Sequence, residues 1–345
     1  MNKVGVVGAG YWAGNHLRAW ASQPDAEVTA LCDTNPGRLA ECGQRFGFPR
    51  SACFTDVSGM LETGKVDILD IVTPPSTHPA LVRAAAERGV HVLCIKPLAE
   101  SRAAGLEIAA AAKAGGIRAM AAENWRWLPG LRRLHSLLES GVVGRPYYAK
   151  YSCLEYATPL MAPGVPMDQP FFREMPRLLL YEMGTHWFDV WRFLFGEPDR
   201  LFAEARRVSS HIAGDDLALV CLSRGSFLGL LEVSWASRVS LEEKLRGIEQ
   251  ITVEGDRGTL VMDAARDIRL IETGATSRIL EPGCGYDMMD SIRPMQAHFL
   301  ECLQSGAPFE TEISDNLRTL SLVFAAYESA ERHEVVHLDG AAAAP

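Results

Sequence analysis

The segment Tyr181–Asp189, which reads YEMGTHWFD, carries three side chains whose types and spacing fit proton transfer. Glu182 and His186 are four residues apart and Asp189 follows three residues later, so all three fall on one face of a helix. A carboxylate beside a histidine holds the ring tautomer and supports its charged form, as a general base requires. The same side chains could bind zinc, but no fourth nitrogen or sulfur ligand is evident, and we predict no metal.

A second set of residues has the pattern of a dinucleotide-binding turn. The segment Val4–Asn15 reads VGVVGAGYWAGN, an apolar strand followed by a glycine turn and the start of a helix. Gly8 permits the tight turn, Gly10 lets the backbone approach a pyrophosphate, and Ala13 is small where the helix packs on the strand. Asp33 ends the next apolar run and could bind both ribose hydroxyls of an adenosine. The pattern predicts a bound dinucleotide.

The type of dinucleotide follows from the same residues. The charge of Asp33 repels a 2′-phosphate, so we expect NAD, with NADP possible. Arg38 could accommodate that phosphate, although a solvated helix charge is the preferred interpretation. Tyr11 and Trp12 follow the glycine turn directly. Such residues are more often packing residues, but they lie beside the cofactor by sequence and are candidates for binding it.

The elements that position these residues alternate in the first third of the chain. Short apolar runs separated by alanine-rich stretches are typical of βαβ units and predict a Rossmann-type parallel sheet. We expect strands at Val4–Val7, Val28–Cys32, Ile68–Val72, His91–Cys94 and Arg118–Ala121. We expect helices at Gly14–Ser22, Pro36–Phe46, Val57–Thr63, Pro79–Arg88 and Ala103–Ala114.

The pattern changes after Asn124, where strands follow one another without helices and predict a mostly antiparallel open sheet in an α+β domain. We therefore expect a Rossmann domain at 1–122 and a substrate-binding and oligomerisation domain at 123–340, with a loose tail at Gly340–Pro345. The expected strands are Leu217–Leu222, Phe227–Trp235, Glu249–Glu254, Gly258–Asp263 and Ile268–Glu272. The expected helices are Gly130–Ser140, Glu182–Phe195, Met295–Leu303 and Asp315–Arg332.

Composition limits the partners and the compartment. The 34 basic and 43 acidic residues give a net charge of -9, which leaves no basic surplus for nucleic acid or an anionic membrane. The eight cysteines contain no C-x-x-C pair and are interpreted as reduced structural thiols. No signal-like segment precedes Val4, and no run of about 18 apolar residues is long enough to span a membrane. We expect a cytoplasmic enzyme.

Two further segments carry a resemblance to a known family. Thr73–His78 reads TPPSTH and Val92–Pro97 reads VLCIKP. They resemble the T-P-x-x-x-H and E-K-P segments of the glucose-fructose oxidoreductase, inositol dehydrogenase and MocA family, and Asn124 and the segment Glu182–Asp189 follow in the expected order. The resemblance implies a Rossmann domain joined to a domain whose open sheet covers the nicotinamide, with a lysine and a histidine at the substrate.

The resemblance assigns roles to individual residues. Lys96 corresponds to the active-site lysine, which would hydrogen-bond the reacting oxygen and oppose its developing negative charge. Ile95 replaces the family's glutamate before that lysine and removes a carboxylate from its side. His186 corresponds to the proton acceptor of the family's D-x-G-x-H pattern, and Glu182 takes the place of the aspartate. Asn124 falls at the substrate.

The turn at Thr73, Pro74 and Pro75 should lie under the nicotinamide, at the carboxyl ends of the strands. His78 belongs to this turn and is a candidate for the cofactor site. The preferred interpretation of His78 is the start of the following helix, with Ser76 or Thr77 as its cap.

The predicted function is a dehydrogenase that oxidises a secondary alcohol, or the anomeric carbon, of a sugar or polyol. Lys96 polarises the oxygen and His186 takes the proton, while Glu182 and Asp189 orient the histidine or bind neighbouring hydroxyls. Arg173 and Arg177 are candidates for binding an acidic substituent of the substrate.

Two alternative functions stay open. The protein could be a glycosidase or epimerase that oxidises a carbon transiently, or a regulator that binds NAD without turnover.

The strand at Phe227–Trp235 places apolar side chains on both faces of its sheet. Leu231 and Val233 lie on one face, and Leu228 and Leu230 lie on the other. One face can cover helices of its own domain and the other needs a partner, so we expect a homodimer or homotetramer.

Overall fold

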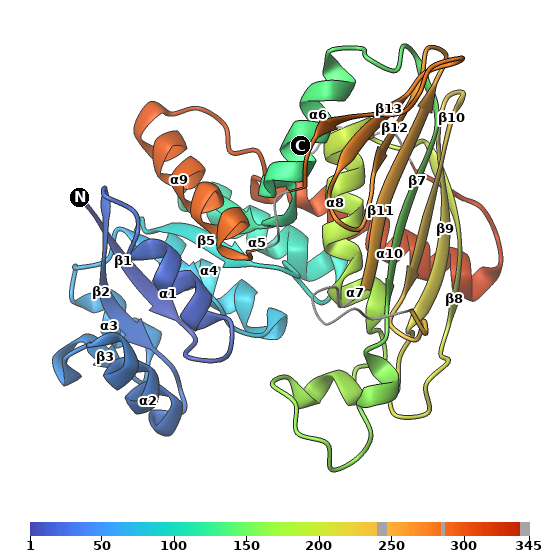
Figure 1. The fold of residues 1–345 in the computed structure, drawn as a ribbon. Coiled ribbons are helices and arrows are strands. Elements are labelled where there is room, and N and C mark those ends of the chain that lie inside the picture. Colours follow the sequence, from blue (N-terminus) through green and yellow to red (C-terminus); the bar gives the residue numbers. More distant parts are fainter. Residues whose placement is uncertain (240–246, 284–286, 339–345) are drawn as a thin grey trace. The chain divides into compact units, whose positions relative to one another are not determined.

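The computed structural model describes residues 1–239, 247–283 and 287–338, and the tail expected at Gly340–Pro345 lies outside them. The chain forms two compact units (Figure 1). The first comprises Met1–Trp127 and Asp287–Leu320, and the second comprises Leu128–Tyr286 and Ser321–Pro345. The sequence predicts a single boundary between residues 122 and 123. The structure differs, because the late segment Asp287–Leu320 returns to the first unit.

The first unit is built on a six-stranded parallel sheet in the order β3-β2-β1-β4-β5-β6. The predicted Rossmann-type sheet is therefore confirmed, with one additional strand, β3, whose two residues are too few to form a sequence pattern. The strands are β1 (Asn2–Val7), β2 (Ala26–Cys32), β3 (Cys53–Phe54), β4 (Ile68–Ile71), β5 (His91–Ile95) and β6 (Ala119–Ala122).

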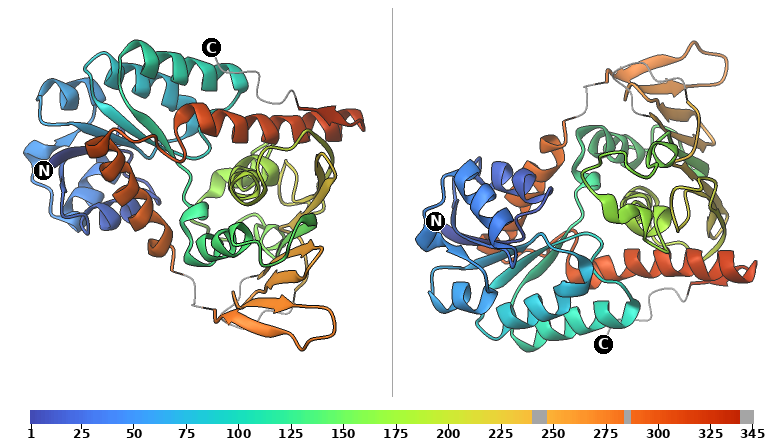
Figure 2. Two further views of the ribbon diagram at one scale, coloured as in Figure 1. Left: turned by 90° about the horizontal axis from the view of Figure 1, so that it is seen from above. Right: turned by 90° about the horizontal axis from the view of Figure 1, so that it is seen from below.

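Helices cover both faces of this sheet, as Figure 2 shows. Helices α1, α2 and α9 contribute apolar side chains to one core cluster with the strands, and α3, α4 and α5 pack with one another. The helices are α1 (Ala13–Trp20), α2 (Pro36–Phe46), α3 (Val57–Glu62), α4 (His78–Ala86), α5 (Arg102–Ala114) and α9 (Met289–Ser305).

Helix α2 illustrates why the sequence predicts these bounds well. The Asn35 side chain accepts hydrogen bonds from the backbone N–H groups of Gly37 and Arg38, and Pro36 occupies the first turn. Gly47 ends the helix at a φ of 77°, a left-handed conformation that glycine adopts without a steric cost. The start and stop signals are therefore local, and the predicted and observed bounds agree.

The second unit is built on a nine-stranded sheet in the order β14-β13-β12-β11-β7-β10-β9-β8-β15. Its pairs are antiparallel except β7 with β10, so the predicted mostly antiparallel sheet is confirmed. The sequence prediction missed β7, β8, β14 and β15. The strands are β7 (Pro146–Glu155), β8 (Arg200–Arg206), β9 (Leu217–Arg224), β10 (Phe227–Ser234), β11 (Gly247–Gly255), β12 (Thr259–Met262), β13 (Ile268–Ile271), β14 (Arg278–Glu281) and β15 (Val336–His337).

The helices of the second unit lie on one face of its sheet (Figures 1 and 2). Strand β10 buries Leu231 and Val233 on that face and exposes half of Leu228 on the other. Gly229 lies under the ring of Trp191, where a Cβ atom would come within 1.6 Å of the ring. The helices are α6 (Pro129–Glu139), α7 (Leu179–Glu182), α8 (Gly184–Phe195) and α10 (Ile313–Arg332), the last of which spans both units.

The predicted helix at Glu182–Phe195 is two helices in the structure. Helix α7 ends at Glu182 and α8 begins at Gly184, with Met183 between them. The backbone N–H groups of His186 and Trp187 both bond to the carbonyl of Met183, at 3.0 and 3.3 Å. The chain therefore keeps turning across the break, but Glu182 belongs to the turn before the helix that carries His186 and Asp189.

Candidate active site

The glycine turn between β1 and α1 has the geometry that a dinucleotide needs. Gly8 has a φ of 104°, and a Cβ atom there would lie 2.3 Å from the carbonyl oxygen of Val72. Gly10 is exposed, and nothing lies within 4 Å of the position its Cβ would occupy. The turn therefore packs closely against β4 at Gly8 and leaves open space at Gly10, where a pyrophosphate can approach the backbone.

Asp33 is fixed across this turn by three contacts. One carboxylate oxygen accepts a hydrogen bond from the N–H of Ala9 at 2.8 Å, and the other accepts one from the N–H of Asn35 at 2.7 Å. The guanidinium of Arg38 lies 3.3 Å from the second oxygen, and its side chain is 57% exposed. Asp33 thus lies next to the turn with its position set, as the binding of ribose hydroxyls requires.

The residues after the glycine turn lead directly into α1. Ala13 is fully buried at the first position of α1, where the sequence predicts a small residue. Tyr11 is half exposed and meets Trp12 edge to face, with ring centroids 5.8 Å apart. The open backbone at Gly10, the start of α1 and the fixed carboxylate of Asp33 together fit an NAD molecule.

Lys96 lies at the carboxyl end of β5, in the wall of a small hollow. The same hollow is lined by Asn124, which follows β6, and by Trp12 from the glycine turn. The amide of Asn124 donates a 2.6 Å hydrogen bond to the hydroxyl of Ser291, at the start of α9. Lys96 and Asn124 are each 8% exposed, so the structure brings these two predicted residues to one site.

His78 connects the two motif segments of the first unit. Its ring nitrogens lie 2.9 Å from the carbonyl oxygen of Leu98 and 2.8 Å from that of Thr73. His78 is fully buried, and burial lowers the pKa of its imidazole. It begins α4 as expected, but Ser76 does not cap the helix, and the hydroxyl of Thr77 instead donates to the carbonyl of Pro74.

The other residues of this turn are more accessible. Thr73 and Pro75 are half-buried and Pro74 is exposed. The hydroxyls of Thr73 and Thr77 are 2.7 Å apart and hydrogen-bonded. Together with His78, they hold the turn at the carboxyl end of β4 in a defined conformation, next to the strand that carries Lys96.

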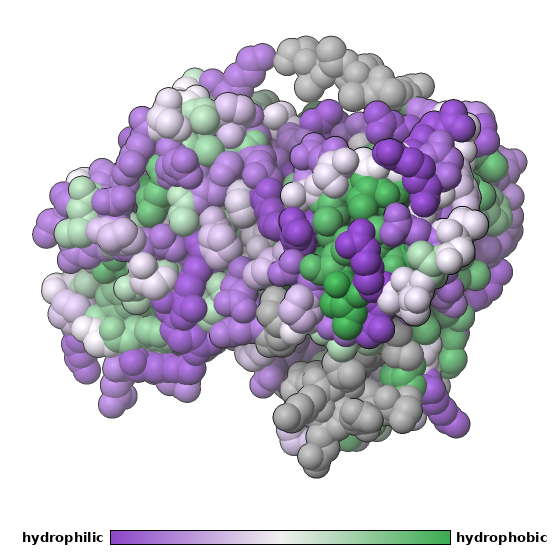
Figure 3. Space-filling model, turned by 45° about the horizontal axis from the view of Figure 1, so that its top comes forward, coloured by the Kyte–Doolittle hydropathy of each residue, from purple (hydrophilic) through white to green (hydrophobic). Residues whose placement is uncertain are grey.

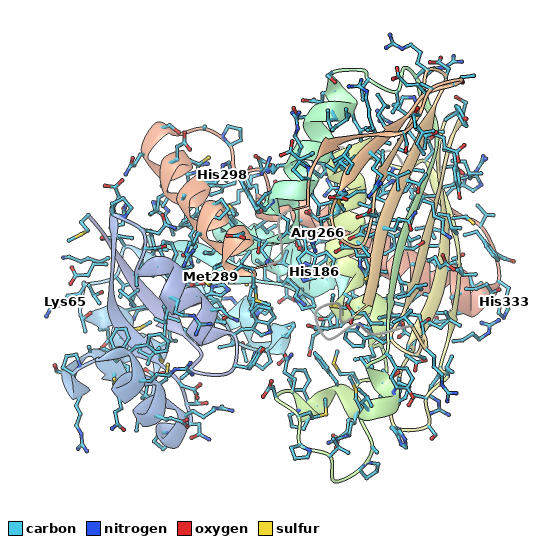
Figure 4. The ribbon with its side chains drawn as sticks, in the orientation of Figure 1. Lys65, His186, Arg266, Met289, His298 and His333 are labelled. Atoms are coloured by element: carbon cyan, nitrogen blue, oxygen red, sulfur yellow. The ribbon has the colours of Figure 1, made fainter. Side chains whose placement is uncertain are left out.

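His186 and Asp189 lie on α8 in the second unit, and Figure 4 labels His186 there. His186 is 3% exposed and Asp189 is fully buried. Glu182 is half-buried at the end of α7. His186 and Asp189 therefore lie on one helix, whereas Glu182, which we expected on the same face of that helix, lies at the end of the preceding helix.

Helix α7 is held in place by Asp215, a residue that the sequence prediction missed. The Asp215 carboxylate accepts hydrogen bonds from the backbone N–H groups of Leu178 and Leu180, each at 2.9 Å, and from the hydroxyl of Tyr327 at 2.8 Å. The same hydroxyl accepts a bond from the N–H of Tyr181. Asp215 and Tyr327 thus fix the turn that carries Glu182.

Arg173 and Arg177 make structural contacts. The guanidinium of Arg173 donates to the carbonyl oxygens of Met161, Ala162 and Val165, at 2.9, 3.1 and 2.6 Å, and thereby holds the loop before α7 together. Arg177 lies 3.3 Å from Glu331 and over the ring of Tyr327. A role for either arginine in binding an acidic substituent stays a prediction.

The described part of the chain offers neither a cluster of metal ligands nor a membrane-spanning helix. Within residues 1–239, 247–283 and 287–338, no group of three or more His, Cys, Asp or Glu side chains could hold a metal ion. In the same part of the chain, no helix combines the length and the apolar character needed to cross a membrane.

Comparison with known proteins identifies the family. The model of the GFO/IDH/MocA oxidoreductase family with an NAD-binding Rossmann fold matches residues 2–123, and the model of the GFO/IDH/MocA C-terminal domain matches residues 131–261. The chain belongs to the GFO/IDH/MocA family. The resemblance inferred from TPPSTH and IKP is thereby confirmed, as are the fold class and NAD as the cofactor of this family.

Relatives within the GFO/IDH/MocA family include sugar and polyol dehydrogenases. D-apiose dehydrogenase of Paraburkholderia graminis is 34% identical over 97% of this chain and 89% of its own length. Myo-inositol 2-dehydrogenase of Thermotoga maritima is 26% identical over 98% of each chain. An oxidoreductase from Agrobacterium radiobacter, solved with NAD⁺, L-tartaric acid and magnesium, superposes with a TM-score of 0.88 at 28% identity and covers 97% of this chain and 98% of that one. The predicted class, an NAD-dependent dehydrogenase, is confirmed.

Proposed function

We propose that this protein oxidises a hydroxyl-bearing carbon of a sugar or polyol with NAD. The observation that carries the proposal is the arrangement at one edge of the parallel sheet. The open glycine turn with Asp33 fixed across it lies at the carboxyl ends of β1 and β2, and Lys96 with Asn124 lies at the carboxyl ends of β5 and β6. Ligands of such sheets bind at this edge.

The residues of this chain have distinct tasks in the proposed reaction. NAD supplies the hydride acceptor when it is bound. The ammonium of Lys96 donates a hydrogen bond to the substrate hydroxyl and opposes the negative charge that grows on its oxygen. His186 accepts the hydroxyl proton, and Glu182 and Asp189 hold its ring or bind neighbouring hydroxyls. Asn124 binds the substrate next to Lys96.

The first substrate to test is D-apiose, because the D-apiose dehydrogenase of P. graminis covers almost the whole chain. NADH formation should be recorded with D-apiose, myo-inositol, other pentoses and hexoses, and levoglucosan, each with NAD and with NADP. A substrate-dependent rise in NADH supports the dehydrogenase and names its substrate. Product with no net NADH would indicate a transient oxidation of the epimerase or glycosidase type, and nucleotide binding without any product would indicate a sensor.

We also propose that the outer face of the nine-stranded sheet forms a homodimer or homotetramer interface. Leu219 on β9 and Leu228 on β10 are 45% and 49% exposed there, and Cys221 is exposed between them. Figure 3 shows, on the face it presents, a further apolar area of the second unit among hydrophilic side chains.

We also propose a cytoplasmic location for the protein. Free thiols support this proposal, such as the thiol of Cys32, whose pKa is raised to about 12 by burial.

Light scattering of a charged variant tests the interface. Leu219→Arg should shift the mass from an oligomer to a monomer, because a guanidinium in the centre of an apolar interface would lose its hydration without gaining a partner. Leu106→Arg is the matched control, since Leu106 is 61% exposed on α5 of the first unit. A wild-type monomer at micromolar concentration would contradict the proposal.

A further inference from the structure

Asp70 is a buried carboxylate inside the first unit that the proposed function does not use. It lies in the middle of β4, is fully buried, and points to the side of the sheet covered by α1 and α9. Nδ1 of His16 lies 2.9 and 3.1 Å from its two oxygens, and the indole N–H of Trp20 donates to one of them at 2.6 Å. A buried charge needs such partners to persist.

His16 connects this carboxylate with Lys96. Both side chains line the same small hollow, together with Ile95 and Asn124. Asp70 pairs with Leu93 on β5, and Ile95 follows two residues later on the same face, so Asp70 lies one pleat deeper in the sheet than Ile95. Ile95 itself brings no charge to the hollow.

We propose that the Asp70–His16 pair is an electrostatic positioning device for the nicotinamide end of the site. It presents the negative charge of the Asp70 carboxylate to the hollow, where this charge balances the ammonium of Lys96. The same charge favours the oxidised nicotinamide, whose ring is cationic, over the neutral reduced ring. The inference rests on the proposed function, because it places the nicotinamide at the hollow that contains Lys96.

The geometry supports a charge effect through a defined path. Nδ1 of His16 is held on the carboxylate, so the opposite ring nitrogen faces away from Asp70. The groups around His16 are Asp70 from β4, Trp20 from its own helix, Lys96 after β5, and Gln296 of α9, which donates to the backbone carbonyl of His16. The negative charge of Asp70 is therefore separated from the hollow by one imidazole ring.

The test compares the affinities of the full-length protein for NAD⁺ and NADH, which needs no substrate. Asp70→Asn should weaken NAD⁺ relative to NADH on the order of tenfold, the effect of one charge about 12 Å away at an effective dielectric of about 20. Asp67→Asn is the matched control, because Asp67 is exposed at the opposite end of the same strand segment and should leave the ratio unchanged. Equal weakening of both nucleotides by Asp70→Asn would overturn the proposal.

A second variant keeps the carboxylate and removes the imidazole. His16→Asn places an amide N–H near the position of Nδ1 and lacks the second ring nitrogen. His16→Asn should keep the wild-type ratio of the NAD⁺ and NADH affinities, because Asp70 keeps its negative charge. A ratio that falls in this variant as far as in Asp70→Asn would overturn the proposal, and a wild type that binds neither nucleotide would overturn the proposed function as well.

Discussion

The cofactor-binding edge of the first unit and helix α8 of the second unit are held by different kinds of contact. The Asp33 carboxylate accepts a hydrogen bond from the N–H of Ala9, and Gly8 packs against the end of the neighbouring strand β4. The edge is therefore built from residues of one βαβ unit and of the strand beside it. Helix α8 instead depends on Gly229, which lies far along the chain, and its neighbour α7 depends on Asp215. Changes in the second unit should therefore alter chemistry and stability while NAD binding persists.

His186→Ala should show the largest difference between an effect on turnover and an effect on NAD affinity. If its imidazole accepts the substrate proton, kcat should fall by about 10² to 10⁴, the usual contribution of a general base. The affinity for NAD, measured by fluorescence titration, should stay near the wild-type value. His333→Ala is the control, because His333 is 62% exposed in the same unit. Full turnover by a folded His186→Ala protein would assign the base to another group.

The second prediction concerns the contact that holds α8 on its sheet. Gly229→Ala should lower the free energy of unfolding by about 2 to 4 kcal/mol, because the new Cβ would overlap the ring of Trp191 and force it to shift. Denaturant unfolding measures the loss, and Trp191→Phe in the same chain should recover part of it.

The control for this substitution is Gly59→Ala. Gly59 lies within α3, where alanine favours the helix and the nearest atom to the new Cβ, on Asp56, is 3.9 Å away. A Gly229→Ala protein as stable as the wild type would mean that α8 is anchored by other contacts.

The sequence predicts most of the first unit because its signals are local. Strand Val4–Val7, the glycine turn and the caps of α2 are each recognised from a few neighbouring residues. The two-residue β3 and the return of Asp287–Leu320 to this unit have no local pattern, because contacts with distant segments decide them.

The candidate site divides in the same way. Gly8, Asp33 and Lys96 follow from motifs and lie at the carboxyl ends of β1, β2 and β5, while their roles stay predictions. Asp70 and Asp215 are missed because their partners are far away in the chain. One signal existed for Asp70, a charged residue in the centre of the apolar run Ile68–Val72, which needs a buried partner.

A third prediction tests the cofactor edge itself. Asp33→Ser should weaken NAD by about 10- to 100-fold, since charge-assisted hydrogen bonds are each worth about 1.5 to 3 kcal/mol, and should relieve the repulsion of NADP. Arg38 lies next to the changed position and favours the added phosphate. Asp25→Ser, an exposed change in the same unit, is the control. An unchanged NAD to NADP ratio would remove Asp33 from the ribose site.

The smallest expected effect is the acid sensitivity of the first unit through His78. Burial lowers the pKa of its imidazole below the ordinary value of 6.5, so the unfolded chain binds this proton more readily than the folded one. The contribution of neutral His78 to the free energy of unfolding is therefore complete above pH 6.5, and it is lost as the pH falls from there through the lowered pKa.

Denaturant midpoints between neutral pH and about 5.5 should therefore decline, in a range where most carboxylates keep their charge. His91, whose pKa burial also lowers, adds to the same slope. His78→Gln should start from a lower stability, because the contacts with the carbonyls of Thr73 and Leu98 weaken, but its decline with acid should be shallower than that of the wild type. A decline of the same steepness in both proteins would mean that the proton is taken up elsewhere and that His78 only joins the two loops.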